Sequence, residues 1–262
     1  MVNYYPSGDQ PEGPVAEPPP VVTSSTAPPV PRAARPSGAP KWETDARTRL
    51  RAAIQKYQRP LSELAQRDAN EGDTRLLVTD FLCDALGFDK FSDLTTEYQV
   101  RGEFADYGVR VEKQLTAFIE VKRISTKLGP RHLRQVEMYA VNEGVEWMIL
   151  TNGAVWQVWH LTPGMPVGID LVIEADLLSD ATPLQKTSEL FYLTIEAMKR
   201  HQIDELWKAR SATSPKALAA LLRSPVLLEA LRKELRRTSG HRAEAPELLK
   251  LLNETVIRPE IG

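Results

Sequence analysis

The stretch Ala117-Phe118-Ile119-Glu120-Val121-Lys122 has the composition of a buried β-strand, yet an acid and an amine interrupt it. Side chains alternate along a strand, so Ile119 and Val121 are expected on one face and Glu120 and Lys122 on the other. Glu and Lys are seldom buried unless they are paired or serve a site. An acid and an amine side by side at the rim of a core suggest a metal ligand next to a catalytic amine.

The elements around this strand predict a mixed α/β (α+β) fold. Further strands are predicted at 95–100, 104–111, 145–150, 155–161 and 169–173, with 115–122 as the strand just described. Helices are predicted at 42–58, at 70–86, from 130 to about 142, and repeatedly after residue 183. One helix therefore crosses between strands while others precede and follow them. This order predicts a mixed α/β core with helical flanks.

Individual residues predict where several elements begin and end. Asn70 is a candidate N-cap, and Gly87 ends the same helix. Asn152-Gly153 is a strong signal for a hairpin turn between two strands. Pro60 is expected to start a short helix of its own, because proline fits the first turn of a helix and disrupts its interior.

Proline usage divides the chain into three parts. Residues 1–42 hold eleven of the twenty prolines and few large apolar residues, which predicts a disordered, partly polyproline tail. Residues 43–180 are expected to form one strand-containing domain, and 183–262 a helical C-terminal region. The stretch 199–242 carries eleven Lys and Arg against four Asp and Glu. Attraction to a phosphate backbone and docking on the core through its leucines both remain open for this stretch.

Composition sets broader limits. The 262 residues are 42% hydrophobic and 26% charged with a formal net charge of −2, which is ordinary for a soluble globular protein. The single cysteine, Cys83, excludes an internal disulfide framework and is expected in the core. No segment has the roughly 18 apolar residues that a membrane span needs, and no secretory signal is visible. We therefore expect a cytoplasmic protein that does not enter a membrane.

The central carboxylates suit metal-assisted phosphodiester hydrolysis. Mg²⁺ can activate the attacking water and neutralise charge on the phosphate, and it prefers carboxylate oxygens while keeping several waters. Asp106 and Glu120 can supply these oxygens if their strands are hairpin neighbours, and Lys122 would act beside the attacking water. The backbone carbonyl of Val121 and the carboxylate of Glu71 are further candidate ligands. Mn²⁺ is a candidate substitute for Mg²⁺.

Asp106 followed by Glu120, Val121 and Lys122 resembles the motif of the PD-(D/E)xK nuclease superfamily. More narrowly, the sequence resembles the N-terminal nuclease region of type I restriction enzyme R subunits. The stretches that support the narrower resemblance are EGDTR at 71–75, LGFD at 86–89, the QxxxY motif at 135–139 and the hairpin sequence WMILTNG at 147–153. Together they cover about residues 68 to 162. A lone D…ExK pattern is weak, whereas four ordered stretches are more specific.

The resemblance implies that residues 43–180 form a nuclease domain with a restriction-endonuclease-like mixed sheet. It further implies a Mg²⁺-dependent DNA endonuclease that serves restriction, defence or DNA processing. It implies that Gln135 and Tyr139 support the site and contact the nucleic acid. The chain departs from the superfamily at Ala105, where proline is usual. No GxxxxGK[ST] nucleotide-binding loop occurs in the 262 residues, so the motor of full R subunits is missing from this sequence. Helicase, methyltransferase or specificity subunits encoded elsewhere are therefore candidate partners.

Plainer interpretations stand beside these. In one alternative, Glu120 and Lys122 form a solvated ion pair on an exposed face of the sheet. In another, Glu71 is only a first-turn acid that stabilises the N-terminus of its helix. Tyr139 fits a core aromatic nearly as well as a site residue. The basic residues Lys127, Arg131 and Arg134 fit phosphate contacts or a solvated helix face, and His132 has no expected role. At the level of function, a non-catalytic nuclease-like subunit that binds nucleic acid or a partner is the alternative, and RNA is the lesser substrate.

Overall fold

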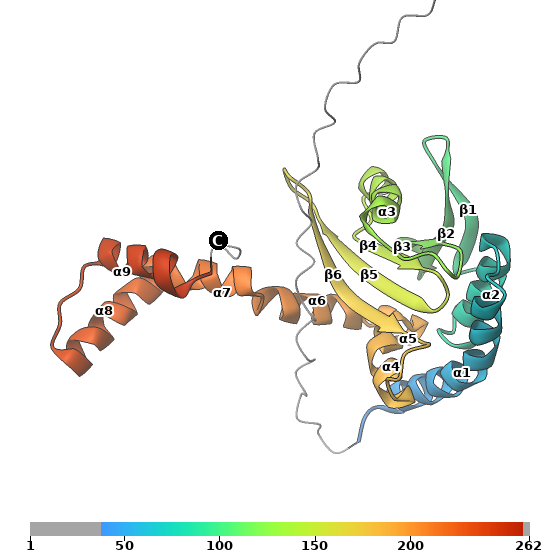
Figure 1. The fold of residues 1–262 in the computed structure, drawn as a ribbon, viewed down its shortest axis with the longest axis horizontal. Coiled ribbons are helices and arrows are strands. Elements are labelled where there is room, and N and C mark those ends of the chain that lie inside the picture. The colour runs from blue at the N-terminus through green and yellow to red at the C-terminus, as the bar shows by residue number, and fades with distance from the viewer. Residues whose placement is uncertain (1–37, 259–262) are drawn as a thin grey trace, which may run out of the picture. The chain divides into compact units, whose positions relative to one another are not determined.

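The fold is described by a computed structural model that covers residues 38–258, and it is built around one six-stranded sheet (Figure 1). The strands follow the chain in the order β1 Leu94–Val100, β2 Glu103–Val111, β3 Gln114–Val121, β4 Trp147–Thr151, β5 Val155–Thr162 and β6 Gly168–Asp176. All neighbours are antiparallel except β3 and β4, which are parallel. Parallel neighbours need a crossover, and helix α3, Pro130–Glu143, supplies it. The predicted mixed α/β class is confirmed.

Helices flank this sheet in sequence and in space. They are α1 Lys41–Gln66, α2 Glu71–Asp84, α4 Pro183–Leu190, α5 Ile195–Met198, α6 Gln202–Ala212, α7 Pro215–Leu222, α8 Pro225–Ser239 and α9 Ala245–Leu251, with a 3₁₀ turn at Phe191–Leu193 and a π turn at Leu252–Val256. Helix α2 starts as predicted, since Asn70 accepts a hydrogen bond from the backbone N–H of Asp73 at 2.8 Å. Helices α3, α4, α7 and α8 begin at a proline, whose missing N–H costs nothing there.

The two faces of the sheet bury separate apolar clusters. Ile119 and Val121 of β3 belong to the larger cluster, which α1, α2 and the helices after β6 cover. Phe118 belongs to the smaller one, which α3 covers together with Tyr139. The alternation predicted for the strand is thus what divides its residues between the two clusters. Cys83 packs, partly buried, against the larger cluster.

The prediction that Pro60 starts a separate helix is wrong. Helix α1 runs unbroken from Lys41 to Gln66 with Pro60 inside it. Leu50, Tyr57 and Leu61 are buried along one face of this helix, so the apolar stripe continues past the proline. Burying that stripe against α2, α4 and α5 outweighs the lost backbone hydrogen bond, which costs roughly 3 kcal/mol.

The C-terminal leucines do not dock on the core around the sheet as one interpretation expected. Leu218, Leu221, Leu227 and Leu231 remain exposed by 37% to 52%. Helices α7 and α8 contact their neighbours in sequence, with Ala219 and Leu228 buried in the small contacts that result. This part of the chain therefore presents an apolar face together with its basic residues.

The remaining domain predictions concern boundaries. Most of the predicted disordered tail, residues 1–42, lies outside the described residues, and α1 already begins at Lys41. The boundaries at 43–180 and 183–262 stay predictions. Between residues 38 and 258, no helix combines the length and the apolar character that crossing a membrane would take.

Candidate active site between two separating strands

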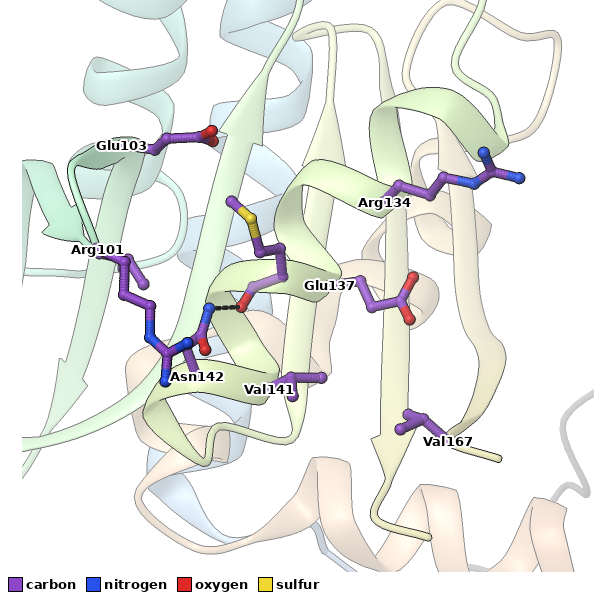
Figure 2. A pocket seen from close by; sticks show the side chains of 9 residues that line it. Arg101, Glu103, Arg134, Glu137, Val141, Asn142 and Val167 are labelled. Atoms are coloured by element: carbon purple, nitrogen blue, oxygen red, sulfur yellow. Dashed lines mark hydrogen bonds between the residues drawn. The ribbon is translucent and has the colours of Figure 1, made fainter. Parts of the chain in front are cut away.

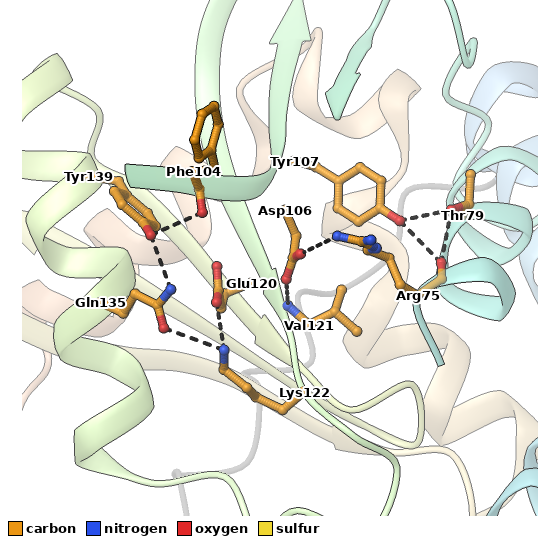
Figure 3. A network of polar contacts seen from close by, with 10 residues as sticks. All are labelled: Arg75, Thr79, Phe104, Asp106, Tyr107, Glu120, Val121, Lys122, Gln135 and Tyr139. Atoms are coloured by element: carbon orange, nitrogen blue, oxygen red, sulfur yellow. Dashed lines mark hydrogen bonds and ion pairs between the residues drawn. The ribbon is translucent and has the colours of Figure 1, made fainter. Parts of the chain in front are cut away.

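The strands β2 and β3 separate at Asp106. Their pairing runs from Val111 opposite Gln114 up to Tyr107 opposite Ile119. One residue further on, the side chain of Asp106 takes over the role of the neighbouring strand: its Oδ2 accepts a hydrogen bond from the backbone N–H of Val121 at 2.7 Å (Figure 3). The carboxylate is therefore fixed at the fork by β3 itself.

Glu120 and Lys122 lie together on the α3 side of this fork. The Lys122 Nζ is 2.6 Å from Glu120 Oε1, and the side chains of lysine and acid are only 14% and 4% exposed. The pair is therefore buried, and the interpretation of it as a solvated surface ion pair is wrong. A buried ion pair is not by itself stabilising, because desolvation offsets the attraction. Such a pair at the end of a strand suggests a role other than stability.

Helix α3 holds the ammonium group from the other side. Lys122 Nζ lies 3.4 Å from Gln135 Oε1, and Gln135 Nε2 donates to the Tyr139 hydroxyl at 3.0 Å. That hydroxyl donates in turn to the backbone carbonyl of Phe104 at 3.0 Å. Gln135 and Tyr139 are one turn apart on α3, so both reach the same side. Tyr139 is also buried in the smaller core cluster, so both expectations for this residue describe it.

The charges at the fork shift one another. Burial, and then the nearby charge of Asp106, raise the pKa of Glu120 to about 7, although Lys122 acts against this rise. Burial lowers the pKa of Lys122, but its contact with Glu120 outweighs burial and the net pKa is raised. The lysine is therefore charged at neutral pH, whereas Glu120 is close to half-ionised. The Glu120 Oε2 atom is buried and has no hydrogen-bond partner within residues 38–258.

These donors fit a hard divalent cation. A buried carboxylate oxygen without a partner is costly unless something binds it, and Glu120 Oε2 is such an oxygen beside a second carboxylate, that of Asp106. No three His, Cys, Asp or Glu side chains in the described part of the chain gather closely enough to hold a metal. Glu71 is exposed at the first residue of α2 and acts on Lys122 only through its charge. Two carboxylates with several waters suit Mg²⁺.

Arg75 is a site residue that the sequence interpretation missed. Its Nη1 lies 3.0 Å from Asp106 Oδ1, and its side chain is 40% exposed while that of Asp106 is 12% exposed. The residue stands in α2, on the opposite side of Asp106 from the Glu120 and Lys122 pair (Figure 3). The stretch EGDTR at 71–75 contained it, but nothing local indicated that a residue 31 positions later would be its partner.

Two buried polar residues hold the segment that follows Lys122. The backbone N–H of Ile124 donates to Thr74 Oγ1 at 3.2 Å, and Asn152 Nδ2 donates to the carbonyls of Ile124 and Thr126 at 3.0 Å each. Asn152 Oδ1 also accepts from the N–H groups of the turn between β4 and β5. The EGDTR and WMILTNG stretches thus meet at the end of β3.

The expected basic residues are exposed but are not gathered at the fork. Lys127, Arg131 and Arg134 all have exposed side chains. Arg134 lines a separate groove of about 600 Å³ over α3, together with Arg101 and Glu103 (Figure 2). None of the residues at the fork lines this groove.

His132, to which the sequence assigned no role, stands near the site. Burial and then the charges of Arg131 and Lys122 lower the pKa of His132. Its Nδ1 is buried without a hydrogen-bond partner within the described residues. The imidazole is therefore neutral at pH 7 and adds no charge to the fork.

Comparison with known proteins gives one result. Residues 70–167 match the sequence model of the family described as type I restriction enzyme R protein N terminus. The matched segment contains the fork and the helix that supports it. No curated protein matches the chain, and no solved structure does.

Proposed function

We propose that this chain hydrolyses DNA phosphodiester bonds with Mg²⁺, because residues 70–167 match the family described as type I restriction enzyme R protein N terminus. The observation that carries the proposal is the buried pair of Glu120 and Lys122 beside Asp106, with Glu120 Oε2 left without a partner. Burying these charges and an unpartnered oxygen costs folding free energy. A bound cation and a phosphate would supply the missing partners.

Each residue has a part that follows from its contacts. Asp106 and Glu120 supply carboxylate oxygens for the cation, with the Val121 carbonyl as a further candidate. Lys122 is held between Glu120 Oε1 and Gln135 Oε1, so its ammonium group keeps one position next to the scissile phosphate and the attacking water. Tyr139 fixes Gln135 in the orientation that accepts from the lysine. A bound Mg²⁺, or Mn²⁺ in its place, would lower the pKa of the attacking water and offset charge on the leaving oxygen.

The test is divalent-dependent cleavage of linear, circular and single-stranded DNA. Lys122→Ala and Asp106→Ala are expected to lower the cleavage rate by about 100-fold or more, since each removes a charge that acts on the transition state. Lys90→Ala, which removes an exposed lysine elsewhere on the surface, is the matched control and should cut like the parent protein. All variants should keep the circular dichroism spectrum of the parent. A parent protein that cuts neither DNA nor RNA with Mg²⁺ or Mn²⁺ would contradict the proposal.

A second candidate is a non-catalytic, nuclease-like subunit that binds nucleic acid or a partner protein. The observation that favours it is Arg75, which pairs with Asp106 and so occupies one of the two carboxylates. Isothermal titration with Mg²⁺ separates the two functions. A working site takes up the cation and loses this uptake in Asp106→Ala, whereas a binding module without a working site shows no carboxylate-dependent uptake.

The proposed setting is a restriction or defence assembly. DNA is the proposed substrate, and a helicase or methyltransferase and specificity subunits are the proposed protein partners. Purification of the tagged chain from its own cells, followed by identification of the proteins that accompany it, tests this setting.

A further inference from the structure

Arg75 and the backbone of Val121 contact the two oxygens of the Asp106 carboxylate. Asp106 has two oxygens, and both are engaged: Oδ1 by the guanidinium of Arg75 and Oδ2 by the backbone of Val121. Each oxygen keeps a lone pair that a cation could share, but the charge of the adjacent guanidinium opposes a cation there. The Val121 contact is part of the backbone geometry of β3, so the contact that can yield is the one with Arg75.

Arg75 is built to be released. Its side chain is 40% exposed, whereas Asp106 is 12% exposed and cannot follow the guanidinium outward. Solvent screening weakens an ion pair with one partner this exposed. The backbone of Arg75 is meanwhile fixed, because its carbonyl accepts hydrogen bonds from the hydroxyl groups of Thr79 and Tyr107. The head group can therefore turn while its attachment point stays in place.

We propose that Arg75 is a positioning residue with two partners: it neutralises Asp106 when no cation is bound, and it turns to the substrate phosphate when a divalent cation takes that carboxylate. This inference rests on the proposed function and adds the residue that couples cation binding to substrate binding. Guanidinium groups bind carboxylate and phosphate with the same planar arrangement of donors, so one side chain can serve both. The exchange keeps a positive charge opposite every negative one in both states.

Cation titration is the readout that a merely structural role would not move. With the full chain and Mg²⁺ alone, Arg75→Ala is expected to bind the cation roughly three- to tenfold more tightly than the parent, because a competing charge has been removed. Arg75→Lys keeps the positive charge but loses the guanidinium group. Its Mg²⁺ affinity is expected to lie between those of the parent and Arg75→Ala. Arg67→Ala breaks an ion pair with Asp73 at the start of the same helix and serves as the matched control. Its Mg²⁺ affinity should equal that of the parent.

DNA binding supplies the second readout. Measured with Ca²⁺ in place of Mg²⁺, Arg75→Ala is expected to bind DNA more weakly than the parent, while Arg67→Ala is unchanged. Opposite changes in cation and DNA affinity support the exchange of partners. Unchanged or weaker Mg²⁺ binding by Arg75→Ala, in a parent that binds Mg²⁺, overturns this inference and leaves the proposed function standing. A parent that takes up no Mg²⁺ at all overturns the proposed function instead.

Discussion

Glu120 is a proposed metal ligand, and its burial also affects the stability of the fold. The residue is 3% exposed, and burial together with Asp106 raises its pKa to about 7. Its ionised form is therefore disfavoured in the folded chain and favoured in water. A fold that needed only stability would place an apolar residue of similar size here. The acid and its lysine are therefore the residues on which the proposed reaction depends.

The raised pKa predicts a pH dependence for the metal-free protein. Since the folded state binds this proton more tightly than the unfolded one, the contribution of Glu120 is most favourable below its ordinary pKa near 4.5 and is lost as the pH rises to about 7. The loss amounts to at most about 3 kcal/mol. Glu120→Gln keeps the neutral form at every pH. We expect the free energy of unfolding of this variant, relative to the parent, to rise between pH 4.5 and 7 in urea titrations with a chelator. A difference that does not change with pH would contradict this assignment.

Among the elements, the segment after β3 depends on residues far from it in sequence. Asn152 donates to the carbonyls of Ile124 and Thr126 while its own oxygen accepts two backbone N–H groups. Every polar atom of this buried amide is used. The turn predicted at Asn152-Gly153 is confirmed. The side chain of Asn152 also holds the segment that follows β3, through the carbonyls of Ile124 and Thr126.

Asn152→Ala is therefore expected to destabilise the protein by about 2 kcal/mol or more, because it leaves two buried carbonyls without a donor. It should also raise hydrogen exchange at residues 123–129. Asn142→Ala is the matched control, because it removes a single exposed hydrogen bond, to the Met138 carbonyl within α3. The expected change in the free energy of unfolding is within about 0.5 kcal/mol. Thermal and urea unfolding measure both. Equal effects of the two variants would show that the anchoring is not needed.

Element boundaries were predicted where a local physical rule decides them. The alternation in β3, the N-cap at Asn70 and the start of a helix at Pro130 are decided within a few residues. Pro60 was wrongly interpreted because its local cost is real but smaller than the burial of the stripe that contains Leu61. That burial depends on the packing of α2, α4 and α5 against α1, which a local rule does not include.

For the whole molecule, the basic residues after α6 bear on DNA binding. Arg232 and Arg237 of α8 pair with glutamates, whereas Lys233 and Arg236 are exposed and form no ion pair within residues 38–258. Free cations of this kind are the ones that release counterions when a phosphate backbone binds.

If these cations contact DNA, Lys233→Ala combined with Arg236→Ala should reduce the slope of log K against log salt concentration by about 1.8. Titrations of DNA binding between low and physiological salt, with Ca²⁺ present, measure the slope. Lys90→Ala should leave it unchanged. An unaltered slope in the double variant would assign these residues to a solvated face.

What the sequence by itself determined is the strand of residues 115–122, the helix that follows it and the sharing of one face by Glu120 and Lys122, because alternation, capping and proline act over a few residues. The tertiary structure decided the rest. It separated β2 and β3 at Asp106, brought Arg75 to that carboxylate from 31 positions away, and tied Thr74 and Asn152 to Ile124. These contacts follow from the parallel pairing of β3 with β4 and from the packing of α2 on the sheet, and no spacing along the chain encodes either one.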